Sequence, residues 1–348
     1  MLKSYLDKNL AGIMKAATIS KDKLVISKVK RPTLTEKGAI IKVHGCGLCG
    51  SDIVKLKTGI SKDGDVLGHE VVGEIVEIDS STTFQVGDRI VLGHHVPCFD
   101  CVYCWGGNYS MCRSFKNTNI FPGGFAEYIF ASELHLQNTA FIPNPELSDD
   151  EAAFLEPLAC CIRAIKRSEI PHSSRVLIVG LGSIGLLMGQ AAQAMGYKAI
   201  GCDIIPERVD LAKRLGFEEA MVSTDQNTII SKVKEFTSDY GADAVFMTSG
   251  SDRTLDLALK SIRDGGTIIV FSSIKTDLGY SNNDIYYREL KVLGSYSPAP
   301  VDLEDSLEFL QSRKVIVENL STHYTIEHIN EAIQDTITNK IIKAYITL

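Results

Sequence analysis

The stretch that decides the fold is Val176-Leu177-Ile178-Val179-Gly180-Leu181-Gly182-Ser183-Ile184-Gly185. Its four leading apolar residues predict a buried strand. The Gly-x-Gly-x-x-Gly turn then opens a segment whose apolar residues recur at helical spacing as far as Met195. Glycines let the backbone approach a ligand closely, and a helix N-terminus attracts phosphate. We therefore predict a dinucleotide site whose pyrophosphate lies against Gly180, Gly182, Ser183, Ile184 and Gly185. A tight strand–helix turn that binds nothing is the alternative interpretation.

Asp203 indicates which dinucleotide to expect. It follows the apolar run Ala199–Cys202 and lies 18 residues past Gly185. A carboxylate at this position accepts hydrogen bonds from the adenosine ribose hydroxyls and repels a 2′-phosphate, so the sequence predicts NAD as the cofactor. Arg208, expected in the first turn of the next helix, is the nearby cation that would favour a 2′-phosphate instead.

The sequence pattern before the glycine-rich segment differs from the pattern that begins with it. Before about residue 155, short runs such as Ala39–Val43 and Val71–Ile78 are broken by Gly, Asp and Pro, which predicts many short strands. From about Ser174, strand patterns alternate with helical ones, as in a doubly wound parallel sheet. The last part holds a helical pattern over Leu303–Arg313 and a strand-like end at Lys343–Leu348. We predict an α/β protein with two domains of unlike type.

Composition excludes several classes of protein. Of the 348 residues, 45% are apolar and 23% charged, which rules out a disordered chain. A formal net charge of −7 argues against nucleic acid and anionic membrane as partners. The uncharged segment Val176–Tyr197 imitates a membrane span, but its glycines divide it into a strand and a helix. Without a signal-peptide pattern at the N-terminus, and with nine clustered cysteines, the sequence predicts a cytoplasmic protein.

Four of the cysteines form a compact motif, Cys98-x2-Cys101-x2-Cys104-x7-Cys112. Thiolates at this spacing can surround one ion tetrahedrally, and four sulfurs leave no open position, so the motif predicts a structural zinc site. An iron–sulfur cluster is the rival interpretation, although the Cys-Pro of bacterial ferredoxins is missing. Four unrelated buried cysteines are the remaining alternative.

Two shorter fragments suggest a second metal site. Gly47-Leu48-Cys49-Gly50-Ser51-Asp52 offers a thiol beside a hydroxyl, and Gly68-His69-Glu70 offers an imidazole beside a carboxylate. Each fragment alone is more typical of an ordinary loop. Together they supply the sulfur, nitrogen and oxygen donors that suit an open, catalytic zinc.

The motifs taken in order resemble a known family. GLCGSD, GHEVVGEI, VGDRIV, the cysteine motif, GGFAEY, FLEPL and GLGSIG follow one another as in the zinc-dependent medium-chain dehydrogenases, over residues 14–348. Glu156-Pro157 is similar to the polyol branch, which includes sorbitol, galactitol-phosphate and threonine dehydrogenases. The resemblance implies a GroES-like, mostly β catalytic domain over 1–160 with a structural zinc lobe at 95–113. It further implies a Rossmann NAD-binding domain over 161–298 and a C-terminal segment, 299–348, that returns to the catalytic domain.

The same resemblance implies roles for individual residues. Cys49 and His69 are expected to bind the catalytic zinc, with Glu70 and Glu156 near it, each ligating directly or through water. Ser51 is expected to relay the substrate proton. Val54 stands where many relatives have a histidine, which leaves the exit of that proton open. Asp52 is expected to orient the zinc loop. Two zinc ions per chain and a homodimer or homotetramer complete the expectation.

The function expected is oxidation of a secondary alcohol, a polyol or a sugar-alcohol phosphate to a ketone, with NAD as the hydride acceptor. Two alternatives remain at this point. One is an enone or quinone reductase that uses no zinc. The other is a catalytically inactive relative that senses zinc or redox state. Met14 looks like the usual start of the family, so we expect either that residues 1–13 form an arm of unassigned role or that Met14 is an alternative start.

Overall fold

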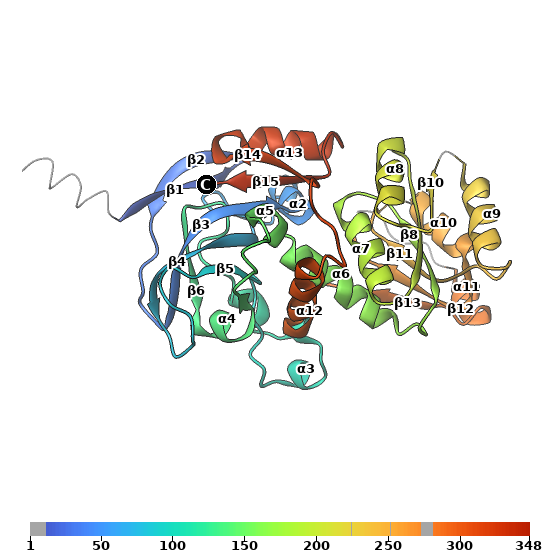
Figure 1. Ribbon diagram of the computed structural model, residues 1–348, viewed down its shortest axis with the longest axis horizontal. Coiled ribbons are helices and arrows are strands. Elements are labelled where there is room, and N and C mark those ends of the chain that lie inside the picture. Colours follow the sequence, from blue (N-terminus) through green and yellow to red (C-terminus); the bar gives the residue numbers. More distant parts are fainter. Residues whose placement is uncertain (1–11, 224, 251, 273–280) are drawn as a thin grey trace, which may run out of the picture. The chain divides into compact units, whose positions relative to one another are not determined.

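The computed structural model describes residues 12–223, 225–250, 252–272 and 281–348. Most of the expected N-terminal arm, residues 1–11, lies outside the described residues. The chain divides into two compact units (Figure 1). Unit 1 consists of the chain as far as Glu156 together with Ala299–Gln311 and Val317–Leu348, and unit 2 consists of Pro157–Pro298 and Ser312–Ile316.

Unit 1 is built on a seven-stranded sheet in the order β14-β15-β3-β4-β5-β7, with β6 also paired to β3. Only the β14–β15 pair is parallel within that sheet. The strands are β3 (Gly38–Leu48), β4 (Glu70–Asp79), β5 (Arg89–Leu92), β6 (Tyr128–Ser132), β7 (Ala140–Phe141), β14 (Ser321–Thr325) and β15 (Lys343–Thr347). A separate hairpin consists of β1 (Ile13–Ser20) and β2 (Lys23–Lys30).

The helices of unit 1 are short and lie around this sheet. They are α2 (Gly50–Thr58), α3 (Val102–Trp105), α4 (Glu133–Asn138), α5 (Asp149–Ala152), α12 (Pro300–Gln311) and α13 (Ile329–Ile337), with the 3₁₀ turns η1 (Tyr109–Met111), η2 (Phe115–Asn117) and η3 (Ile326–His328). Figure 1 shows α13 packed against β14 and β15. Ile41, Ile75 and Ile90 of the central strands are fully buried and belong to one hydrophobic core cluster.

Unit 2 contains a six-stranded parallel sheet in the order β10-β9-β8-β11-β12-β13. The strands are β8 (Arg175–Val179), β9 (Lys198–Asp203), β10 (Glu219–Val222), β11 (Ala242–Met247), β12 (Ile262–Val270) and β13 (Lys291–Gly294). The helices are α7 (Ser183–Ala194), α8 (Pro206–Arg214), α9 (Gln226–Phe236), α10 (Asp252–Ser261) and α11 (Asn282–Tyr287), while α6 (Leu155–Ser168) carries the boundary between the units. The strand order reverses between β8 and β11, and open sheets bind ligands at such a reversal. The predicted doubly wound parallel sheet is confirmed.

The segment that imitates a membrane span is resolved into β8, the glycine turn and α7. None of the helices in the described part of the chain combines the length and the apolar character that a membrane crossing needs.

Candidate active site

The four cysteines at 98–112 come together in a lobe of short elements, α3, η1 and the loops between them. The Cys98 sulfur lies 3.5 Å from that of Cys112 and 4.0 Å from that of Cys104, and Cys101 lies 3.5 Å from Cys104. All four sulfurs fall within 4.8 Å of one another. Tetrahedral ligands about 2.3 Å from a zinc ion lie about 3.8 Å apart, so these positions fit a closed zinc site.

Backbone donors support the charged form of one of these thiols. Burial favours the neutral form of Cys112, yet backbone N–H groups of Cys98 and Ser114 lower the pKa of its thiol to about 6. The Cys98 N–H donates to the Cys112 sulfur over 3.5 Å. A thiolate is the form that binds metal, so this backbone prepares the lobe for an ion.

A second cluster of possible ligands lies at one end of β3 and β4. Cys49 is the N-cap of α2, and His69 and Glu70 stand at the start of β4. The ligand atoms of these three residues lie within 4.8 Å of one another. One sulfur, one nitrogen and one oxygen donor fit a zinc ion that keeps an open position for substrate.

Asp52 holds this second cluster in place. Its buried carboxylate accepts the Cys49 N–H at 3.1 Å and the Gly68 N–H at 3.3 Å, and lies 3.2 Å from His69 Nδ1. Because Nδ1 faces Asp52, Nε2 is the nitrogen left for a metal. Burial alone would lower the pKa of His69, but Asp52 and Cys49 outweigh it and raise that pKa well above its usual value. Protons and a metal ion therefore compete for this imidazole.

The glycine turn of unit 2 leaves a cradle at the N-terminus of α7. Gly180 has a φ of 98°, which favours glycine, and a Cβ at Gly185 would overlap the Gly180 carbonyl oxygen. Gly182 is the N-cap and has no side chain to cap the first turn. Within the described residues, the buried Ser183 Oγ has no hydrogen-bond partner. Uncapped N–H groups and an unpaired hydroxyl fit the pyrophosphate of a dinucleotide.

Asp203 stands beside this turn, at the end of β9. Its carboxylate accepts the Leu181 N–H at 2.6 Å and the Ile205 N–H at 2.9 Å. Arg208, in the first turn of α8, places Nη1 3.7 Å from Asp203 Oδ2. Asp203 and Arg208, which the sequence pattern singles out, are thus neighbours, and Arg208 offsets part of the Asp203 charge.

Comparison with known proteins gives the family. The zinc-binding dehydrogenase profile matches residues 183–312, and the alcohol dehydrogenase GroES-like domain profile matches residues 35–140. Sorbitol dehydrogenase of Halalkalibacterium halodurans is 33% identical over 92% of this chain and 95% of its own length. D-arabitol-phosphate dehydrogenase of Enterococcus avium is 30% identical over 98% of both chains. The structure of galactitol-1-phosphate dehydrogenase from Escherichia coli superposes with a TM-score of 0.85 at 26% identity, over 96% of this chain and 100% of that one.

The chain belongs to the zinc-dependent medium-chain dehydrogenases. The predicted fold class, a GroES-like domain with a Rossmann domain, is confirmed, and so is the resemblance to the polyol branch.

Three of the predicted ligands of this dehydrogenase, Cys49, His69 and Glu70, have clustered ligand atoms. Glu156 places its Oε1 3.8 Å from His94 Nδ1. The His94 ring in turn lies 4.7 Å from the His69 ring. Burial, together with His69 and His95, lowers the pKa of His94 well below its usual value, so His94 is a neutral neighbour of the site.

Two residues beside this site, His94 and Lys343, are not predicted by the sequence motifs. Lys343 Nζ lies 2.7 Å from Glu70 Oε1 and also contacts Oε2. The sequence held one signal for each: adjacent histidines four and three residues before the cysteine motif, and a charged residue that opens an otherwise apolar strand.

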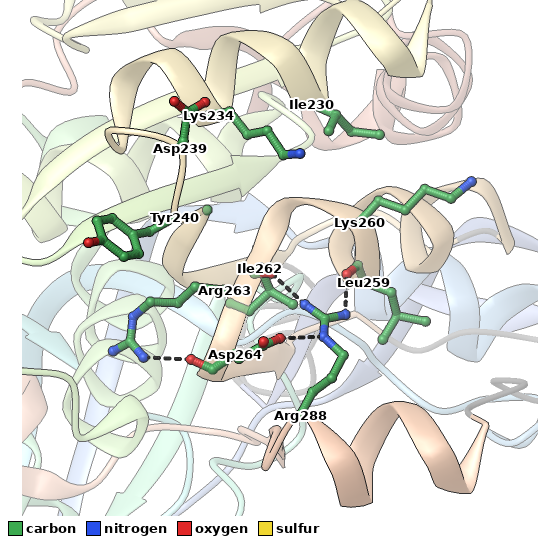
Figure 2. Close-up of a pocket in the computed structure, with 11 residues that line it drawn as sticks. Ile230, Lys234, Asp239, Tyr240, Leu259, Lys260, Ile262, Arg263, Asp264 and Arg288 are labelled. Atoms are coloured by element: carbon green, nitrogen blue, oxygen red, sulfur yellow. Dashed lines mark hydrogen bonds and ion pairs between the residues drawn. The ribbon is translucent and has the colours of Figure 1, made fainter.

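A hollow of about 510 Å³ in unit 2 is a separate feature (Figure 2). It lies at the amino ends of β11 and β12, whereas the glycine turn follows the carboxyl end of β8. Arg288 on its wall already bonds to Asp264, and to the carbonyls of Leu259 and Ile262. Because this guanidinium is committed to the fold, and none of the predicted site residues lines the hollow, we do not assign a ligand to it.

Proposed function

We propose that this dehydrogenase oxidises a secondary alcohol of a polyol, or of a sugar-alcohol phosphate, to a ketone with NAD+ as hydride acceptor. The observation that carries the proposal is the Cys49, His69 and Glu70 cluster in a chain that also has the glycine cradle of a dinucleotide site. The names of the relatives, sorbitol and D-arabitol-phosphate dehydrogenase, support polyols as the substrate class.

The metal ion, the cofactor and the protein would each contribute a different part of the reaction. A zinc ion held by Cys49 and His69, with Glu70 and Glu156 nearby, would supply Lewis acidity to the substrate oxygen, and NAD+ would accept the hydride. The protein's part is to fix the ligands through Asp52 and to handle the hydroxyl proton. We propose that the cysteine lobe holds the second, structural zinc.

Ser51 is the residue we propose for that proton. It is exposed, and its backbone N–H donates to the Cys49 sulfur at 3.5 Å, which fixes its position beside that ligand. Its hydroxyl can take a proton on one side and release another on the other. Val54, one helical turn on, is 37% exposed and cannot carry a proton. We therefore propose that the proton leaves from Ser51 Oγ directly to water.

Two further proposals concern the whole protein. Large apolar side chains stand exposed on the cysteine lobe, with Val102 at 70% and Trp105 at 74%, which supports a homodimer or homotetramer in which a second copy covers such a surface. None of the nine cysteines, all of which lie in the described part of the chain, is joined in a disulfide, which supports a reducing compartment such as the cytoplasm.

The test is a zinc analysis combined with an activity screen. We expect two zinc ions per chain, and NADH formation with at least one member of a panel of polyols and sugar-alcohol phosphates. Cys49→Ala should lose one zinc ion and nearly all activity. Cys46 is a buried cysteine three residues away, and Cys46→Ala should keep both zinc ions and the activity.

The same measurement separates the alternatives. One zinc ion and no turnover with any alcohol would indicate a sensor. No zinc, with reduction of an enone or a quinone, would indicate a reductase. Near-normal turnover of Cys49→Ala would remove Cys49 from the ligand set.

A further inference from the structure

A buried ion pair connects the last strand of unit 1 to the predicted metal ligands. Lys343 opens β15 and Glu70 opens β4, 273 residues earlier, and both side chains are almost fully buried. The sheet register explains the meeting: β15 pairs Ala344 with Leu48 of β3, and β3 pairs Gly47 with Glu70. Lys343 therefore reaches Glu70 across the end of β3.

Gly47 makes room for the pair. A Cβ at this position would overlap Glu70 Oε2 and would lie 3.1 Å from Lys343 Cε. Any other residue at position 47 would push the carboxylate and the ammonium apart. The sequence, strand register and missing side chain together fix one arrangement, in which Nζ contacts both oxygens of Glu70.

The charge near Lys343 is negative from several sides. Glu70, Cys49 and Glu156 all lie within electrostatic reach of Lys343, and its Nζ lies 2.7 Å from Glu70 Oε1. Dehydrating an ammonium costs several kcal/mol, so a buried lysine persists only where anions compensate it. With Cys49 bound as a thiolate and both glutamates ionised, the three anions would leave one negative charge beyond the two positive charges of a zinc ion, and the Lys343 ammonium would offset it.

A carboxylate whose two oxygens both contact an ammonium is a weaker metal ligand than a carboxylate without that partner. The ammonium and the metal ion compete for the same oxygen lone pairs. A catalytic zinc keeps its Lewis acidity when it is not saturated by anionic ligands. We propose that Lys343 is a positioning residue that divides the Glu70 carboxylate between itself and the catalytic metal, so that the metal keeps an open, acidic position for the substrate oxygen. This inference rests on the proposed function.

The test removes the charge of Lys343 and leaves the packing. Lys343→Gln can still donate a hydrogen bond to Glu70, and Lys343→Met removes the donor as well. We expect both variants to bind two zinc ions, to release the catalytic zinc more slowly to a chelator, and to lose about 10- to 100-fold in kcat. Lys343→Arg, which keeps the charge, should recover most of the activity. Lys340→Met is the matched control, because Lys340 pairs with Asp335 at an exposed site on the same segment.

A spectroscopic readout does not depend on turnover. Cobalt replaces zinc in both proteins, and the spectrum of Cys49→Ala is subtracted to remove the bands of the cobalt ion in the cysteine lobe. The remaining d–d bands, which belong to the catalytic site, should be weaker in Lys343→Gln because Glu70 adds to the coordination of the metal. A merely structural lysine would instead give faster metal release and unchanged bands. Unchanged bands and kcat in Lys343→Gln would overturn the proposal. Absence of metal at this site in the unmutated protein would refute the proposed function itself.

Discussion

A single carboxylate, Asp203, is placed to govern the choice of cofactor. Two backbone N–H groups hold it in position, and its charge faces the place where the adenosine ribose is expected. Arg208 lies 3.7 Å away and would be the partner of a 2′-phosphate. The two side chains favour opposite cofactors, because Asp203 favours NAD+ and Arg208 would favour NADP+.

Asp203→Asn tests this balance, because the amide loses the charge and keeps an acceptor oxygen for one of the two backbone N–H groups. One charge-assisted hydrogen bond is worth about 1.5–3 kcal/mol, so kcat/KM with NAD+ should fall about 10- to 100-fold, and the preference over NADP+ should narrow. Asp243→Asn is the matched control, since Asp243 also accepts a backbone N–H, that of Arg175, at the far end of β8. Equal kcat/KM for both cofactors before mutation would mean that Arg208 prevails.

At the scale of elements, the cysteine lobe is the part least able to fold unaided. Its α3 has four residues and its 3₁₀ turn η1 has three, too few to be stable alone. Its apolar cluster consists mainly of the cysteines themselves, packed with Phe115 just after the lobe. A zinc ion bound by the four thiolates would join these short elements into one body.

Cys101→Ser should therefore lose the structural zinc and lower the thermal stability of the protein while the catalytic zinc stays bound. Calorimetry and zinc analysis measure the two effects separately. Met111→Ser, at a half-exposed position of the same lobe, is the control and should keep both zinc ions and the melting temperature. Unchanged stability in a Cys101→Ser protein that has lost one zinc would contradict a structural role.

The contacts between elements explain which features of the site could be predicted from the sequence and which could not. Motifs whose residues are close in the chain, such as the cysteine lobe and the glycine turn, were predicted with their chemistry, because spacing alone brings their atoms together. Lys343 and His94 were missed because their partners, Glu70 and Glu156, are set by strand register and by packing between distant segments. No local pattern encodes that Lys343 meets a residue 273 positions earlier.

At the scale of the whole molecule, we predict that the protein assembles into a homodimer or a homotetramer. The exposed apolar residues of the lobe, including Trp105, would cost free energy in water, and a second copy can cover them. Light scattering at micromolar concentration should give a mass two or four times that of one 38.1 kDa chain. A monomer at that concentration would contradict the prediction, and Trp105→Ser should shift the equilibrium toward smaller species.

The place of β15 has a consequence for biosynthesis. The sheet of unit 2 has all six of its strands once Gly294 has left the ribosome, whereas the sheet of unit 1 still waits for the strand that lies between β14 and β3. That strand follows the other described strands in chain order, and it brings the Lys343 ammonium that pairs with Glu70. A nascent chain can thus assemble its nucleotide cradle early, whereas Glu70 meets its ammonium only once translation has delivered Lys343.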